Sequence, residues 1–108
     1  MSISERDRAI ANVRKAFTEG TTSDEQRNAI MNLIAPGNEH FCMRVLDAAE
    51  VKTYPESKEE KRAAAHKILV DFMKSGNAPE KIVDYAANIM AGHMTMPHQV
   101  HINQAFRI

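Results

Sequence analysis

The sequence has little cysteine, no excess of charge of either sign and no long apolar run. Cys42 is the single cysteine among 108 residues, so an internal disulfide, and with it a secreted disulfide scaffold, is excluded. Lys and Arg number 14, as do Asp and Glu, which disfavours both a strongly basic nucleic-acid binder and an acidic DNA mimic. No stretch approaches the roughly 20 apolar residues of a membrane span, so we expect no membrane partner.

The first residues also lack the apolar centre of a secretory signal peptide. The segment from Ser4 to Arg8 alternates acidic and basic side chains instead. We therefore expect a cytoplasmic location, where the free thiol of Cys42 stays reduced.

Motifs of catalysis are missing as well. The chain has no glycine-rich phosphate loop, no H-E-x-x-H metal motif and no G-x-S-x-G nucleophile motif. His40 and Cys42 lie two residues apart, and on a helix such neighbours point in different directions. Cys42 also shares an apolar stripe with Phe41 and Val45, which favours a buried, unreactive thiol. We therefore expect a protein that is not an enzyme and uses no cofactor.

Helical periodicity is the main positive signal. Apolar residues recur on one helical face, as Ile10, Val13 and Phe17 do. A later stripe consists of Ile82, Val83, Ala86, Ile89 and Met90. The pattern predicts an all-α fold, a compact bundle of five or six short helices with orthogonal or irregular packing. Start and stop signals place the helices between Ser4 and Gly20, Ser23 and Pro36, Asn38 and Val51, Ser57 and Gly76, Asn77 and Gly92, and Thr95 and Phe106.

The C-terminal pattern fits two structures. Thr95 to Pro97 can open a helix, whereas Val100, Ile102, Phe106 and Ile108 share the parity of a strand. We favour the helix, because no other strand pattern is present in the chain to pair with. We divide the chain into a helical core domain, residues 1–92, and a C-terminal segment, residues 93–108, that packs on the core or on a partner.

One segment stands out, because residues 85–106 contain no Lys, Arg, Asp or Glu in a chain that is 26 % charged. The segment could be buried, with methionines as adaptable filler. It could instead be a partner surface, since interface cores are depleted in charge and enriched in Met and aromatic residues. A third interpretation is a metal site with His93, His98 and His101 as ligands. The metal interpretation is the weakest, because no carboxylate in the segment could orient the imidazoles.

These patterns favour a small protein–protein interaction module, such as an adaptor, inhibitor or regulator that docks on a larger protein partner and also forms a homodimer. The profile resembles that of small inhibitors carried by phages and mobile elements. The expected contact residues are Met94, Met96, Val100, Ile102 and Phe106.

Two alternatives remain open. Residues 79–92 and 97–106 have roughly the spacing of a helix-turn-helix DNA-binding regulator. However, the second of these helices has no charge before Arg107, and so lacks the basic residues that position such helices on DNA. A DNA-binding regulator would instead use the first predicted helix, between Ser4 and Gly20, or the fourth, between Ser57 and Gly76, where Lys and Arg are interleaved with acidic residues. The other alternative is a His/Met-rich metal-binding protein that uses the three histidines named above.

Overall fold

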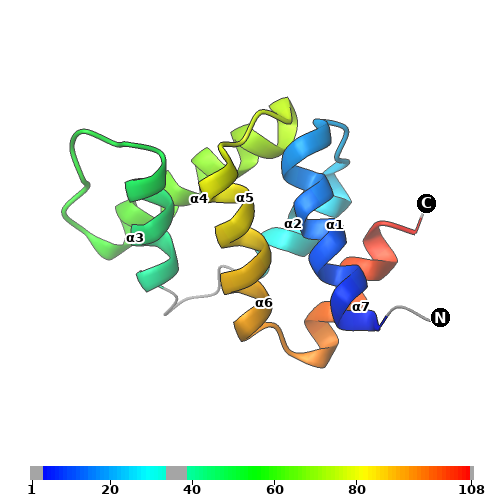
Figure 1. Cartoon of the computed structure of the whole chain (residues 1–108). Helices are drawn as coiled ribbons and strands as arrows, with labels where there is room; N and C mark the ends of the chain where they lie inside the picture. The colour runs from blue at the N-terminus through cyan, green and yellow to red at the C-terminus, as the bar shows by residue number, and fades with distance from the viewer. Residues whose placement is uncertain (1–3, 34–38, 108) are drawn as a thin grey trace.

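The computed structural model describes residues 4–33 and 39–107, and Figure 1 shows the arrangement of their helices. Within these residues the chain forms six helices and no strand, which confirms the predicted all-α bundle. The helices are α1 (Glu5–Glu19), α2 (Asp24–Met31), α3 (Glu39–Ala48), α4 (Lys58–Ser75), a continuous helix of α5 (Glu80–Asp84), the π-helical η1 (Tyr85–Ile89) and α6 (Met90–His93), and α7 (Met96–Ala105). None of the helices in this part of the chain combines the length and apolarity needed to cross a bilayer.

Side-chain caps begin three of these helices as predicted. The Ser4 hydroxyl accepts the Asp7 backbone N–H at 3.1 Å. At α2 the capping box is complete, because Ser23 Oγ accepts the Gln26 N–H at 3.2 Å and Gln26 Oε1 accepts the Ser23 N–H at 2.9 Å. At α4 only the serine half is present, with Ser57 accepting the N3 backbone N–H at 3.1 Å. Each such cap stabilises its helix by about 1 kcal/mol.

The ends of α1 and α4 meet backbone to backbone. Gly20 and Gly76 terminate these helices at φ 68° and φ 70°, the left-handed conformation that favours glycine. A Cβ on Gly76 would lie 2.6 Å from the Gly20 nitrogen, and a Cβ on Gly20 would lie 3.0 Å from the Ser75 carbonyl carbon. Glycine is therefore required at both positions for two reasons, the left-handed torsion angles and the close approach of the two turns.

The continuous helix of α5, η1 and α6 contains a π-helical turn that sequence periodicity did not predict. Met90 donates its N–H to the Tyr85 carbonyl, the i to i−5 bond of a π-helix. The residues buried on one side recur every four positions, at Ile82, Ala86, Met90 and Met94. A regular α-helix has 3.6 residues per turn and would rotate this stripe away from the core, so the wider π turn keeps it facing inward. The prediction that Ile89 belongs to the buried stripe is wrong, since its side chain is 37 % exposed.

Two predicted boundaries of this helix are also wrong. Asn77 is not its cap, because the helix begins at Glu80 after Pro79, and the Asn77 side chain accepts a hydrogen bond from Ser75 Oγ. Gly92 is not its end, because it lies inside α6. The last helical residue is His93, and the backbone at Met94 is extended.

The end of α2 differs from the prediction too. The helix ends at Met31, before the predicted stop, and the Leu33 N–H bonds the Ile30 carbonyl at 3.0 Å in a tight turn. This turn lets Leu33 enter the core. Two residues that limit predicted helices, Pro36 and Asn38, lie outside the described residues, as does Ile108.

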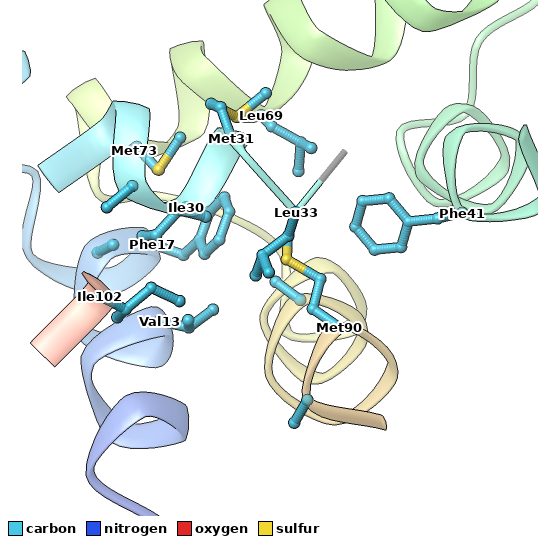
Figure 2. Close-up of a cluster of buried hydrophobic side chains, with 14 of the residues drawn as sticks. Val13, Phe17, Ile30, Met31, Leu33, Phe41, Leu69, Met73, Met90 and Ile102 are labelled. Carbon is cyan, nitrogen blue, oxygen red and sulfur yellow. The ribbon is translucent and has the colours of Figure 1, made fainter. Parts of the chain in front are cut away.

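The core joins helices that are distant in sequence, as Figure 2 shows. Val13 and Phe17 of α1 meet Ile30 of α2, Met73 of α4 and Ile102 of α7, and all five side chains are fully buried. Burial of a side chain of this size contributes about 1.5–3 kcal/mol. The residue from α7 belongs to the same cluster as the rest, so the C-terminal segment packs on the core.

The outlying helix α3 is tied to this core by Phe41. The ring is 1 % exposed and points from α3 toward Leu33 and Met90 (Figure 2). α3 otherwise packs mainly on α4, which runs from α3 at one end of the molecule to α1 and α2 at the other (Figure 1). The predicted connection from Val51 to Glu56 leads from α3 into α4, after a left-handed turn at Glu50 with φ 57°.

We expect Gly76→Ala to lower the free energy of unfolding by at least about 2 kcal/mol, since it adds both left-handed strain and overpacking. Gly92→Ala is the matched control, because a Cβ there meets nothing within 4 Å and the residue is helical. Alanine at that position should raise stability by up to about 1 kcal/mol. Urea denaturation of both variants measures the difference, and equal effects would contradict the close approach of the two turns.

Candidate functional site

The outer face of α7 is the accessible part of the uncharged segment. It is formed by the residues that point away from the core, Met96, Pro97, Val100, His101 and Gln104. Met96 is 62 % exposed and Val100 is 38 % exposed, and the spacing of four residues places them on one side of the helix. The outer face therefore combines two exposed apolar side chains with an absence of charge.

The inner face of α7 belongs to the core. Ile102 is fully buried and Met94, just before the helix, is 7 % exposed, so neither predicted contact residue is part of the accessible surface. Phe106 is half-buried and packs against the same core cluster. Of the five predicted contact residues, the structure brings only Met96 and Val100 to the surface as exposed side chains.

A buried polar side chain fixes this orientation of α7. Asn103 is 3 % exposed, and its amide donates to the Glu5 backbone carbonyl at 2.9 Å and to a Glu5 carboxylate oxygen at 2.7 Å. Its own Oδ1 accepts from Asn12 Nδ2 at 2.9 Å. Because all three bonds run to α1, α7 cannot rotate about its axis without leaving buried polar groups unpaired.

The three histidines of the metal hypothesis do not come together. His98 Nδ1 accepts the Thr95 backbone N–H at 3.5 Å and lies 3.1 Å from the Thr95 hydroxyl, so this ring helps to begin α7. His93 and His101 are exposed. Among residues 4–33 and 39–107, no three His, Cys, Asp or Glu side chains are grouped as metal ligands.

The helix pair with helix-turn-helix spacing is arranged differently from that motif. α7 packs mainly on α1 and α2, rather than on the preceding α6. Its outer face carries no Lys or Arg to contact a phosphate. The geometry of α7 therefore adds nothing in favour of a helix-turn-helix.

Cys42 is buried, as predicted, at 2 % exposure. Burial raises the pKa of its thiol, an effect that the nearby positive charge of Arg62 opposes and the negative charge of Glu39 reinforces. The thiol form is thereby favoured at neutral pH. Since the thiolate is the nucleophile, this environment suits a structural cysteine.

Sequence reasoning missed one feature, which we name the Tyr85 groove. It is a hollow of about 390 Å³ between α3 and the helix that begins with α5. Its lining is Arg44, Asp47, Ala48, Lys81, Asp84 and Tyr85. A signal was present in the sequence, because both helices carry a basic residue, then an aspartate three positions later, then an apolar or aromatic residue.

Comparison of the chain with family models, with curated proteins and with solved structures finds no match.

We expect Asn103→Ala to lower the free energy of unfolding by about 1–3 kcal/mol, because it removes three part-buried hydrogen bonds between α7 and α1. Gln104→Ala is the control on the same helix, and its exposed side chain should change stability by less than about 0.5 kcal/mol. Both values come from urea denaturation at pH 7. A similar small change in the two variants would show that Asn103 does not anchor α7.

Because the pKa of Cys42 is raised, we expect the protein to lose stability at alkaline pH. The folded thiol has a raised pKa, so its contribution is complete below the unfolded value of about 8.5 and falls as the pH rises toward the folded value. The free energy of unfolding of the wild type should therefore drop more between pH 7 and pH 9.5 than that of Cys42→Ala. Parallel pH profiles for the two proteins would contradict the buried thiol.

Proposed function

We propose that this chain is a small, non-enzymatic protein–protein interaction module whose contact surface is the outer face of α7. The observation that carries the proposal is the exposure of Met96 and Val100 on a surface without charge. Interface cores are depleted in charge and enriched in Met, and a surface of this kind loses no charge hydration when a partner covers it.

The anchoring of the helix supports the same proposal. A contact surface binds more tightly when it is already rigid, because less conformational entropy is lost on association. Ile102 and Asn103 fix α7 on the core, so Met96 and Val100 are held in place before any partner arrives. The outer face is thus a preformed surface rather than a segment that must fold on binding.

The first occupant that we propose is a second copy of this chain. In a two-fold dimer the same surface meets itself, so a charge near the symmetry axis would face a like charge. The outer face of α7 avoids this repulsion because it has none. Docking on a larger protein, as an adaptor, inhibitor or regulator of the kind that phages and mobile elements carry, would use the same two apolar side chains.

The non-enzymatic part of the proposal is supported by Cys42, whose burial and raised pKa oppose nucleophilic reactivity. A cytoplasmic location is also part of the proposal, because a reducing compartment preserves the free thiol. DNA binding and metal binding, the two alternatives, gain no support from the contacts described above.

We expect the double variant Met96→Lys/Val100→Lys to abolish self-association. Sedimentation velocity over a range of protein concentrations should show a dimer for the wild type and a 12.1 kDa monomer for the variant. Tyr54→Lys is the control, since Tyr54 is 41 % exposed and lies in the connection before α4, away from the outer face of α7.

A wild type that stays monomeric at all concentrations would contradict the homodimer. Docking on a larger protein is then tested by affinity capture with the same three baits. A captured protein must be lost with the double variant and retained with Tyr54→Lys. Equal capture by all three baits would contradict a role for the outer face of α7.

A further inference from the structure

The Tyr85 groove lies apart from the outer face of α7, and its volume is that of a small-molecule site. Its hollow of about 390 Å³ falls in the range of about 300–1,000 Å³ that ligand pockets occupy. Tyr85 and Ala48 are half-buried and pack against the core, so they give the groove an apolar floor. The charged side chains rise from the two helices on either side.

The two helices contribute matching sets of side chains. α3 provides Arg44, Asp47 and Ala48, and α5 with η1 provides Lys81, Asp84 and Tyr85. Residues at i, i+3 and i+4 share one face of a helix, so each helix presents its whole set to the groove. Each wall thus carries one cation and one carboxylate.

The two carboxylates are bonded to groups outside the groove. Asp84 Oδ1 accepts from Arg14 Nη2 at 2.8 Å, an ion pair with α1. Asp47 Oδ1 accepts a hydrogen bond from the Tyr54 hydroxyl. The Asp47 carboxylate keeps its negative charge in this bond, whereas Asp84 is compensated by Arg14. The three cations Arg14, Arg44 and Lys81 therefore exceed the two carboxylates Asp47 and Asp84 by one positive charge.

Neither Arg44 nor Lys81 forms an ion pair with another described residue. The guanidinium of Arg44 lies over the ring of Tyr85, 5.4 Å from its centroid, and its Nε is 3.4 Å from His40 Nε2. This cation–π contact positions the charge without satisfying its hydrogen-bond donors. Lys81 is exposed and forms no ion pair within the part of the chain that the structure describes.

Acidic residues next to the groove define where in it an anion would lie. The neighbouring hollow, which shares Ala48 and Lys81 with the groove, carries Glu50 and Glu80. These carboxylates would repel an anion there. The favourable position is therefore on the Tyr85 side of Lys81, where Arg44 supplies the second positive charge.

We propose that the Tyr85 groove binds a small organic anion, a phosphate or carboxylate group attached to an apolar body. Arg44 and Lys81 bind the anionic group, Arg44 through paired N–H donors in the fork geometry that suits phosphate and carboxylate. Tyr85 and Ala48 receive the apolar body. Tyr85 also acts as a positioning residue, since its ring holds the guanidinium of Arg44 at the groove.

Phenyl phosphate is a suitable probe, because it joins a dianion to a flat apolar ring. We expect its titration into the ¹⁵N-labelled protein to shift the backbone amide signals of residues 44–48 and 81–85, and to do so less at high salt. Phenol and inorganic phosphate separate the two halves of the probe, and each should bind at least about tenfold more weakly. Inorganic phosphate that binds as tightly as phenyl phosphate would overturn the apolar half of the proposal.

Arg44→Gln/Lys81→Gln should weaken phenyl phosphate at least about tenfold, the loss expected for charge-assisted hydrogen bonds. Lys67→Gln/Lys74→Gln removes the same net charge from exposed positions on α4 and should leave the affinity unchanged. Equal weakening in the two double variants would show that only net charge matters. Shifts outside residues 44–48 and 81–85, or no shifts, would also overturn the proposal, and none of these outcomes bears on the outer face of α7.

Discussion

The backbone contact between Gly20 and Gly76 sets how α1 and α4 meet, and α2 and α7 are placed against that pair. Two helix C-termini, each with a partial negative charge, lie together there. The chain compensates with donors: the Thr22 hydroxyl bonds the Met73 carbonyl at 3.1 Å, and Arg27 donates to the Thr22 carbonyl at 2.6 Å. Arg27 also donates to the Thr22 hydroxyl, so it is linked through that hydroxyl to a carbonyl group in the last turn of α4.

α7 has a buried face and an exposed face, and the hydrogen bonds of Asn103 fix which face is buried. Asn103 fixes the helix to the first turn of α1 at Glu5, and Ile102 beside it fills the core. In this orientation of α7, Met96 and Val100 point outward and are exposed. The contact between Glu5, near the N-terminus, and Asn103, near the C-terminus, therefore decides which apolar residues of α7 stay accessible.

Local sequence patterns are sufficient to predict the helices. They are not sufficient to predict features that depend on contacts between distant parts of the chain. The sequence shows Ser23 as a cap and Gly76 as a helix end, because their roles depend on neighbours in the sequence. An α-helical period places Ile89 in the buried stripe, whereas the structure has a π turn there and exposes the side chain. Ile102 could not be separated from its exposed neighbours without knowing which side of α7 meets α1. The groove at Tyr85 was missed because it forms only where α3 and α5 meet, although both halves of its pattern are visible in the sequence.

The π-helical turn makes this helix one residue longer than its buried stripe requires. If one of the exposed residues Asn88 or Ile89 were deleted, Ile82, Ala86, Met90 and Met94 would fall at i, i+4, i+7 and i+11, the stripe of an ordinary α-helix. The π turn would become an α turn, and the same four side chains would still face the core. Chains usually gain and lose residues in loops, whereas this fold has a position inside a helix where its length can change by one.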